Sequence, residues 1–309
     1  MPKHILATVR LHDLIATISA RFEHAGLAFG HGTATAHDEA CWLTAHVLGL
    51  DVTAPLPELT LDAAAQAAVE MVVQARLEQR QPLAYLLGEA WFCGLPWRVN
   101  QHTLVPRSPL AELIQERFHP WLDSTGYHTL LDIGTGCGCI AIACAVYMPW
   151  LQVIGSDIDR DALAVAADNA RRHRVAQRCR WSRADVYAGL QQRFDIIISN
   201  PPYVPAAAAA SMPPEYRHEP AHALYSGDDG LQHVAQILVQ AHAYLNRDGA
   251  LILELGETAA LLQQQLPMLS WIWPHLETGG EGVIIATADM LQRHEHDIKH
   301  WYQQRQQGS

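Results

Sequence analysis

The segment Asn200-Pro201-Pro202-Tyr203 combines a polar residue, two rigid residues and an aromatic residue directly after an apolar run. Each proline fixes its own φ and disfavours helical backbone in the residue before it. The side-chain oxygen of Asn200 and the carbonyl oxygen of Pro201 can then both accept N–H bonds from one planar NH2 group, on which Tyr203 can stack. The segment therefore predicts a catalytic site that holds an amide or exocyclic amino nitrogen with its lone pair directed at an electrophile.

The nitrogen of such a group is a weak nucleophile, because its lone pair is delocalised. Orientation and preorganised electrostatics then have to supply much of the rate. A strong base is not needed before the attack, since the proton can leave once the new bond has formed. No Ser-His-Asp or metal-binding pattern stands near Asn200, and we interpret His294, His296 and His300 as solvated residues of a polar C-terminal helix rather than metal ligands.

A glycine-rich loop, Asp132-Ile133-Gly134-Thr135-Gly136-Cys137-Gly138, follows an expected strand and precedes an expected helix. Glycines permit a tight turn and a close approach of the backbone to a ligand. A dinucleotide-binding loop would have glycine at position 139, where this chain has Cys139. The spacing instead favours a loop under an amino acid-like group, as in the methyl donor S-adenosylmethionine. We expect cofactor contacts from Asp132, Gly134, Thr135, Gly136, Cys137 and Gly138, with Asn200 at the methyl end.

Two further acidic residues end the next two expected strands. Asp157 stands where a carboxylate can accept both hydroxyls of a ribose, although a helix-capping role, which Asp159 could also fill, is the alternative. Asp185 can accept the adenine amino group, and the backbone N–H of Val186 can reach the ring; the alternative is a surface turn. Together with the glycine loop, these positions predict a pocket for S-adenosylmethionine and its product S-adenosylhomocysteine.

The elements that must position these residues alternate between strand and helix from residue 129 onward. In such sheets, ligands bind outside the carboxyl ends of the strands, where Asp132, Asp157, Asp185 and Asn200 all fall. We predict an α/β fold with a doubly wound, mostly parallel sheet like that of class I methyltransferases. The expected strands are 130–133, 151–156, 179–184, 194–199, 250–255, 271–276 and 283–286, the last two joined by a turn at Gly279-Gly280, and the expected helices are 140–147, 161–172, 231–245 and 258–269.

The N-terminal part of the chain has a different pattern. Apolar residues recur at helical spacing over 12–25, 38–48 and 61–77, and Asp62 is placed to cap the third helix. Residues 88–107 are richer in aromatic and β-branched types, with Gly94, Pro96 and Asn100 as turn residues, which predicts a β-hairpin. We expect a helical substrate-recognition domain at 1–86, a β-hairpin connector at 87–108 and a methyltransferase domain at 109–309.

Composition is that of a folded protein. The chain has 309 residues, 49% of them hydrophobic and 17% charged, and a net charge of −11 that disfavours long-range attraction to free nucleic acid. The cysteines at 41, 93, 137, 139, 144 and 179 form no CxxC pair, so we interpret them as buried thiols. We expect no membrane-spanning helix and, from the polar N-terminus, a cytoplasmic location.

The glycine loop, Asp157, Asp185 and Asn200–Tyr203 together resemble the class I methyltransferases that modify amide or exocyclic amino nitrogens. With Leu104-Val105-Pro106-Arg107 and Glu219-Pro220 followed by Leu224 and Gly227, nearly the whole chain resembles the bacterial protein N(5)-glutamine methyltransferases, the HemK/Prm family. That resemblance implies S-adenosylmethionine as methyl donor and a protein glutamine side chain held by Asn200 to Tyr203.

Two bacterial branches of this family are candidates. The stretch Arg107-Ser108-Pro109-Leu110-Ala111-Glu112 departs from the release-factor branch, which has an acidic residue and threonine after a Pro-Arg-Pro step, and often an aromatic where Val186 stands. With residues 29–33 (FGHGT), 38–40 (DEA) and 279–283 (GGEGV), it resembles the branch that methylates a glutamine of large-subunit ribosomal protein L-3. Methylation of the GGQ motif of release factors is the alternative.

Other readings stay open. An adenine-N6 nucleic-acid methyltransferase shares the Asn-Pro-Pro-Tyr motif but needs a basic groove. A basic cluster could touch ribosomal RNA weakly during assembly, although such a cluster is usually a solvated face; its members are Arg171, Arg172, Arg174, Arg178, Arg180 and Arg183. A non-enzymatic binding module is the remaining alternative. Arg107 and Glu112 could belong to a lid over the cofactor or pair with each other, and Glu254, an acid inside an apolar strand, needs a partner that the sequence does not identify.

Overall fold

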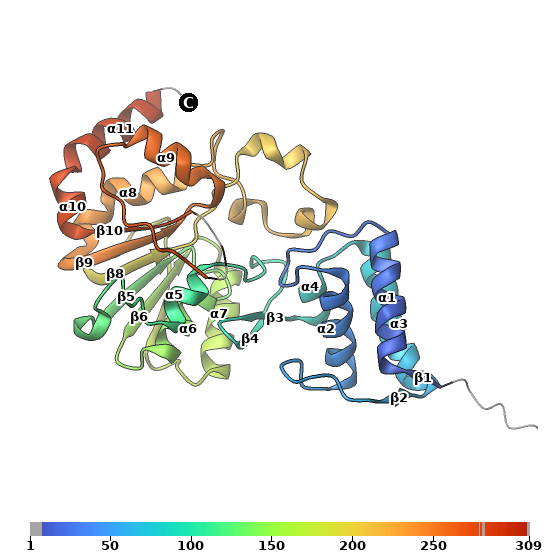
Figure 1. Cartoon of the computed structure of the whole chain (residues 1–309). Coiled ribbons are helices and arrows are strands. Elements are labelled where there is room, and N and C mark those ends of the chain that lie inside the picture. The colour runs from blue at the N-terminus through green and yellow to red at the C-terminus, as the bar shows by residue number, and fades with distance from the viewer. Residues whose placement is uncertain (1–7, 278, 280–281, 308–309) are drawn as a thin grey trace, which may run out of the picture. The chain divides into compact units, whose positions relative to one another are not determined.

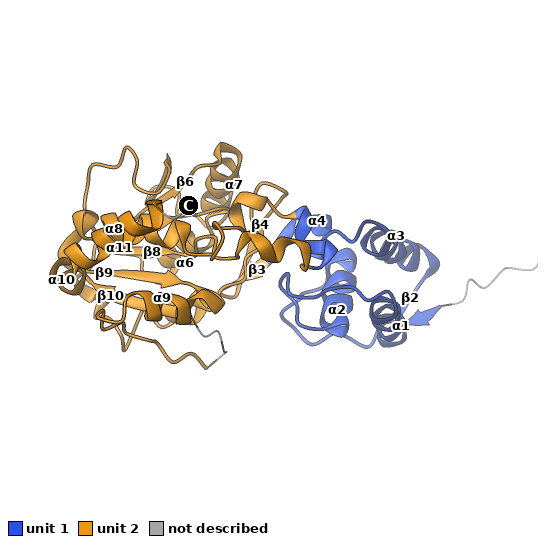
Figure 2. Cartoon of the chain, turned by 90° about the horizontal axis from the view of Figure 1, so that it is seen from above, with its two compact units in different colours: residues 1–90, 213–218 blue, residues 91–212, 219–309 orange. Residues whose placement is uncertain are grey.

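The structure, a computed structural model, describes residues 8–277, 279 and 282–307, and the chain divides into two compact units. Unit 1 comprises Met1–Ala90 and Pro213–His218, and unit 2 comprises Trp91–Met212 and Glu219–Ser309 (Figure 2). The chain therefore passes between the units three times, once near the predicted connector and twice around a short segment after Tyr203.

Unit 2 is built on a six-stranded sheet with the order β10-β9-β8-β5-β6-β7 (Figure 1). All neighbouring strands are parallel except β10, which runs antiparallel to β9. This arrangement confirms the predicted mostly parallel α/β sheet. The strands are β5 Thr129–Ile133, β6 Gln152–Asp157, β7 Cys179–Arg183, β8 Phe194–Ser199, β9 Leu245–Glu254 and β10 Val283–Thr287.

Helices cover both faces of this sheet (Figure 1). Alternate residues of the strands, such as Leu131 and Ile197, pack in one core with α8 Gln232–Tyr244, α9 Ala259–Gln265, α10 Ala288–Arg293 and α11 Glu295–Gln307. The other face carries α5 Leu110–Gln115, α6 Cys139–Tyr147 and α7 Arg160–Arg172. Because β8 is covered on both faces, its run Ile196–Ile198 is fully buried and uniformly apolar.

Short 3₁₀ turns complete unit 2 at Ser124–Gly126, Ala206–Ala210, Ala221–Ala223 and Gly256–Thr258. The strand predicted over 271–276 is wrong, because within this stretch only Ile272 pairs, in an isolated bridge with Ile285. The expected helix 258–269 ends at Gln265, before Pro267. The turn predicted at Gly279-Gly280 falls partly on Gly280, which lies outside the described residues. No helix among residues 8–277 and 282–307 has the length and hydropathy needed to cross a bilayer.

Unit 1 is a small helical bundle with one pair of short strands. It contains β1 Val9–Arg10, α1 Leu11–His24, α2 Ala36–Leu48, β2 Thr60–Leu61, α3 Ala63–Gln79 and α4 Leu83–Leu87, with β1 antiparallel to β2. Leu11, Ile15, Ile18 and Phe22 on α1 are almost fully buried, as their helical spacing predicts. Asp62 caps α3 by accepting the Ala65 N–H at 2.8 Å, which confirms the predicted cap.

Buried charges tie the segment 213–218, which includes the 3₁₀ helix Pro214–His218, into unit 1. Arg76 donates to Glu39 at 2.6 Å and lies 3.5 Å from Glu215, which Arg80 approaches to 2.8 Å. Glu215 also accepts the Ala28 N–H at 3.1 Å. A buried carboxylate needs such partners, so Glu215 fixes the segment by ionic contacts rather than by apolar burial.

The predicted β-hairpin is present as β3 Glu89–Phe92 and β4 Leu95–Arg98. Its two turn residues, Cys93 and Gly94, both have positive φ, 52° and 69°. This is the conformation that the right-handed twist of a two-residue hairpin favours. Trp97 is fully buried and donates its indole N–H to the Phe92 carbonyl at 3.0 Å, which fixes the hairpin.

Candidate active site and cofactor pocket

The glycine loop turns between β5 and α6 with Gly134, Gly136 and Gly138 all at positive φ. The N–H groups of Gly134 and Thr135 donate to the Ser156 carbonyl at 2.8 and 2.9 Å, which joins the loop to the end of β6. At Gly138 a Cβ would lie 2.9 Å from Ile142, so glycine is required for the helix to pack against the turn. The loop is therefore held from both sides in a left-handed path.

Asp132 lies underneath this loop and is completely buried. Its Oδ2 accepts the Thr135 hydroxyl at 2.6 Å and the Ala141 N–H at 3.1 Å. Its Oδ1 is buried without a hydrogen-bond partner within the described structure, and burial raises the pKa of Asp132 to about 7. The carboxyl group thus acts on the shape of the loop and does not line the pocket.

One pocket in unit 2 opens at the carboxyl ends of β5 to β8. Of the residues predicted to bind cofactor or substrate, it collects Gly134, Gly136, Asp157, Asp185, Val186, Asn200, Pro201 and Pro202. Asp132, Thr135, Cys137, Gly138 and Tyr203 are not among its lining residues. The pocket also contains residues that the sequence reasoning did not identify: His102, Leu104, Ile133, Ile158, Ala184, Ser199, His222, Ala223, His233 and Ile237.

Asp157 contributes a buried carboxylate to the pocket floor. Its Oδ2 accepts the Gly136 N–H at 2.8 Å, and its Oδ1 accepts the Asp159 N–H at 2.9 Å. Burial raises the pKa of Asp157. The cap of α7 is Asp159, which accepts the Asp161 N–H at 2.7 Å. Asp157 is therefore not needed as the helix cap, and two of its roughly four acceptor positions stay available for a ligand.

Asp185 and Val186 form the next part of the wall. Val186 has a φ of 54°, which a β-branched residue adopts at a cost in energy. His233 also lines the pocket. Its backbone N–H donates to Ser226 Oγ at 3.0 Å, and the same Oγ lies 2.7 Å from Nδ1 of its ring. Ser226 thus links the backbone and the ring of His233 beside the pocket.

Asn200, Pro201 and Pro202 enter the same pocket directly after β8. Close packing fixes this segment: a Cβ on Gly230 would lie 2.2 Å from the Tyr203 carbonyl oxygen, and one on Gly256 would lie 2.7 Å from the Tyr203 ring. Val204 continues into an isolated parallel bridge with Tyr225. The backbone has little room to move, as the double proline predicts.

The Tyr203 hydroxyl donates to Glu254 Oε1 at 3.0 Å, and the Ser108 hydroxyl donates to Glu254 Oε2 in a short hydrogen bond. Glu254, the last residue of β9, is 3% exposed, and burial raises its pKa to about 7. This acid therefore finds the partners that it requires in Tyr203 and Ser108.

Residues 104–108 form a strap beside the pocket. Arg107 makes two hydrogen bonds to Glu219, at 2.8 and 2.6 Å, and Glu219 also accepts the Val105 N–H at 3.0 Å. The bidentate geometry fixes the direction of the strap as well as its position. Glu112 lies further along and accepts the Glu277 N–H at 2.8 Å. Arg107 thus holds the strap in place through Glu219, a partner that the sequence did not identify.

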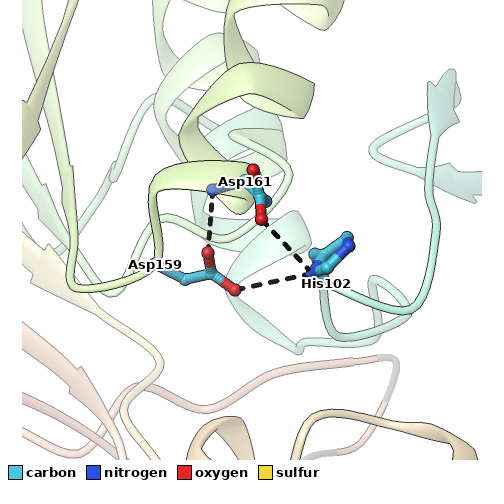
Figure 3. A group of neighbouring side chains, drawn as sticks. All are labelled: His102, Asp159 and Asp161. Carbon is cyan, nitrogen blue, oxygen red and sulfur yellow. Dashed lines mark hydrogen bonds and ion pairs between the residues drawn. The ribbon is translucent and has the colours of Figure 1, made fainter.

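At the rim, His102 faces the first turn of α7 (Figure 3). Its Nδ1 lies 3.8 Å from Asp159 and 4.0 Å from Asp161. Each of the three side chains offers one ligand atom to a possible cation, but Asp161 is exposed and Asp159 already serves as the helix cap. We therefore assign no metal site to this group.

Comparison with known proteins finds relatives over nearly the whole chain. Residues 116–213 match the methyltransferase small domain family, and residues 13–88 match the PrmC N-terminal domain family. The chain is 42% identical to the ribosomal protein uL3 glutamine methyltransferase of Xylella fastidiosa, with 92% of each chain covered. It is 42% identical to the protein of that name in Xanthomonas campestris, covering 91% of this chain and 92% of the relative, and 39% identical to that of Neisseria meningitidis, covering 93% and 95%.

Proposed function

The chain belongs to the family of ribosomal protein uL3 glutamine methyltransferases, and on that premise we propose the part that each residue of its pocket takes in the reaction. The enzyme transfers a methyl group from S-adenosylmethionine to the side-chain amide nitrogen of a glutamine in ribosomal protein uL3, the protein called L-3 above. One observation carries the assignment of roles: Asn200 and Pro201 line the same pocket as Asp157, Asp185 and the glycine loop.

The residues present fit the cofactor. S-adenosylmethionine, when bound, supplies an electrophilic methyl group on a sulfonium. We assign the backbone of Gly134 and Gly136 to its amino acid part, the spare acceptor positions of Asp157 to the ribose hydroxyls, and Asp185 with the Val186 N–H to the adenine edge. The apolar side chains that line the pocket, Leu104, Ile158 and Ile237, suit the faces of a planar base.

Asn200 and Pro201 are assigned to the glutamine amide. The Asn200 side-chain oxygen and the Pro201 carbonyl oxygen each accept one N–H, so the nitrogen lone pair is directed at the methyl carbon. S-adenosylmethionine, if bound, would supply the methyl group to this nitrogen, which would release one proton to solvent. Because two fixed acceptors orient the amide before the attack, positioning rather than a strong base supplies most of the rate.

For the partners, we assign recognition of uL3 to the helices of unit 1 and place the reaction in the cytoplasm. The arginine cluster at residues 171–183 is the candidate for weak contact with ribosomal RNA in a ribosome precursor. Arg171 already pairs with Asp168, and Arg183 donates to the Ile158 carbonyl at 3.2 Å. An RNA contact would make methylation of the precursor more sensitive to salt than methylation of free uL3.

The substrate is tested by offering purified large-subunit proteins and release factors side by side with labelled S-adenosylmethionine. Mass spectrometry then locates the labelled residue. We expect label on a glutamine of uL3. Label on the GGQ glutamine of a release factor would overturn the substrate and keep the chemistry at Asn200.

A further inference from the structure

The loop that follows the catalytic segment, residues 204–226, begins and ends in unit 2. Its two ends are paired: the Val204 N–H donates to the Leu224 carbonyl at 3.0 Å, and the Ser226 N–H donates to the Val204 carbonyl at 2.9 Å. Its middle, residues 213–218, belongs to unit 1 and shares the colour of that unit in Figure 2. The loop therefore starts at the catalytic segment and is held in the unit to which we assign recognition of uL3.

Glu215 joins the middle of this loop to unit 1, and its side chain is completely buried. Arg80 approaches its Oε1 to 2.8 Å and Arg76 to 3.5 Å, and the Ala28 N–H donates to the same oxygen at 3.1 Å. Its Oε2 has no hydrogen-bond partner within the described structure. One buried oxygen thus carries both ion pairs, so the hold on the loop depends on the negative charge of Glu215.

Two neighbours of Glu215 add further contacts with unit 1. The Tyr216 ring lies 4.4 Å from the His31 ring, centroid to centroid, and His218 Nε2 lies 3.0 Å from the Gln79 carbonyl oxygen. Tyr216 and His218 are only partly buried, in contrast to Glu215. Removing the charge of Glu215 should therefore weaken the hold on the loop without abolishing it.

The helices of unit 1 do not depend on Glu215 for their own packing. Arg76 also donates to Glu39 at 2.6 Å, and Arg80 donates to the carbonyls of residues 25 and 26 at 3.1 and 2.8 Å. Both arginines thus join α3 to other parts of unit 1 through groups that a change at Glu215 leaves in place. A variant at Glu215 should consequently release the loop and keep the bundle folded.

The stretch between the catalytic segment and Glu215 suits contact with a polypeptide rather than with a polyanion. Residues 205–214 contain no charged side chain. Their exposed members are Ala206, Ala207, Ala210, Ser211, Pro213 and Pro214. Burying alanine or proline costs no side-chain entropy, so the cost of binding a partner here lies in ordering the backbone. A contact that orders the backbone in advance lowers this cost.

We propose that Glu215 is a positioning residue for the protein substrate: its ion pairs with Arg76 and Arg80 hold loop 204–226 in the arrangement that uL3 requires next to the catalytic segment. This inference rests on the function proposed above and adds the group that prepares the loop for uL3. Glu215 is not among the residues that line the cofactor pocket, so it acts through the loop. A released loop has to be ordered again when uL3 binds, and the apparent affinity for uL3 then falls with the fraction of enzyme whose loop is held.

The test compares Glu215→Gln with the wild-type enzyme, with purified uL3 as the varied substrate. Glutamine keeps the size of the side chain and an oxygen for the Ala28 N–H, and it removes the charge. We expect KM for uL3 to rise about tenfold, because most of the enzyme then has a released loop. We expect kcat and the Kd for S-adenosylmethionine to stay within about twofold, because the paired ends of the loop keep the pocket intact. An unchanged KM for uL3 would overturn the proposal.

Hydrogen exchange measures the hold on the loop without turnover. In Glu215→Gln the amides of residues 215–219 should exchange at least about tenfold faster than in the wild type, whereas those of α1 to α3 keep their rates. Faster exchange throughout unit 1, or a lower kcat at unchanged KM, would indicate a general loss of structure and overturn the positioning role. If the wild-type enzyme methylated no uL3, the proposed function would fail, and the exchange rates would still decide whether Glu215 holds the loop.

Glu70→Gln is the matched control on α3. Glu70 accepts two hydrogen bonds from Arg21, at 2.7 and 2.8 Å, and one from Gln74, so its loss removes an ion pair of unit 1 that does not reach the loop. Its KM for uL3 should equal that of the wild type, and a tenfold rise here would contradict the specific role of Glu215.

A double-mutant cycle tests the ion pair itself. Arg80→Gln removes the nearer cation and leaves the sequence of the loop unchanged, so it should raise KM for uL3 in the same direction as Glu215→Gln. Combined with Glu215→Gln, it should add little to the increase, because the two changes remove one interaction. Increases that multiply in the double variant would show that Arg80 and Glu215 act independently and would refute the proposal.

Discussion

Replacing Asp132 by asparagine tests whether the acid under the glycine loop is held at a cost in stability. The carboxyl group is completely buried, and its Oδ1 has no hydrogen-bond partner within the described structure. Both donors, the Thr135 hydroxyl and the Ala141 N–H, reach Oδ2. Asparagine has the same shape and can keep both bonds with its oxygen, so the substitution removes the charge and leaves the loop contacts in place.

The magnitude follows from the shift in pKa. Burial raises the pKa of Asp132 from 3.8 to about 7. Below about pH 4 the group is protonated in both the folded and the unfolded protein, and this acid does not lower the free energy of unfolding. As the pH rises from 4 toward 7, the free energy of unfolding falls by about 1.4 kcal/mol per pH unit. The buried charge therefore costs up to about 4 kcal/mol above pH 7. Asp132→Asn should regain part of this, since the new NH2 takes the unpartnered place of Oδ1.

The assay is urea unfolding of both proteins at pH 5 and pH 8, each without cofactor. The free energy of unfolding of Asp132→Asn relative to wild type should rise between these pH values by about 2–4 kcal/mol, the greater part of the linkage cost. Asp195→Asn is the control of opposite sign: burial opposes its charge, but bonds from His128, Asn246 and Thr129 lower the pKa of Asp195. A difference for Asp132→Asn that does not change with pH would refute the reasoning.

Three further substitutions test separate parts of the account. Asp157→Ala should weaken binding of S-adenosylmethionine by about 1–3 kcal/mol, the cost of unpaired ribose hydroxyls; unchanged affinity in calorimetry would remove Asp157 from the site. Arg76→Ala should lower the stability of the whole protein by about 3–5 kcal/mol in urea unfolding, because it leaves Glu39 buried without its cation; an effect below about 1 kcal/mol would mean that the pair is not buried in solution. Gly155→Ala places a Cβ 2.4 Å from the Trp181 ring and should cost about 1–3 kcal/mol in the same assay; a neutral result would show that Trp181 moves freely.

The sheet could be predicted from sequence because each of its central strands is a short apolar run that ends in a polar residue. Ile196–Ile198, for example, leaves no polar face, which only a strand covered on both sides allows. The stretch 271–276 is also largely apolar, but it contains Pro274, which cannot donate to a ladder. Trp273 is 40% exposed, and pairing stops at one bridge. Apolar composition alone does not distinguish a strand from a packed loop.

The site could be predicted only where its residues follow one another in the chain. Asn200 to Pro202, Gly134, Gly136, Asp157 and Asp185 line one pocket as the strand ends predict. His222 and His233 carry no local pattern and enter the pocket through the loop and helix after Tyr203. Arg107 and Glu219 are separated by 112 positions, so their pairing depends on the tertiary fold. The roles of Thr135, Cys137 and Gly138 in binding the cofactor stay predictions.

Segment 213–218 shows the same limit for domain boundaries. An alanine run at 206–210 and the prolines at 213 and 214 mark a local change in composition, but nothing in the sequence indicates that residues 213–218 belong with the N-terminal helices. Their attachment depends on Glu215 meeting Arg76 and Arg80 across more than 130 positions. Such contacts between charges distant in sequence are specific but have no local periodicity.

The central claim is that Asn200 holds the glutamine amide for attack rather than the cofactor. Its most direct test is methyl transfer to uL3 by Asn200→Ala, with the affinity for S-adenosylmethionine measured on the same preparation. We predict loss of turnover by a factor of at least about 100, as one acceptor and its orientation are removed, with cofactor affinity within about twofold of wild type. Turnover that survives, or a loss explained by weaker cofactor binding alone, would contradict the account.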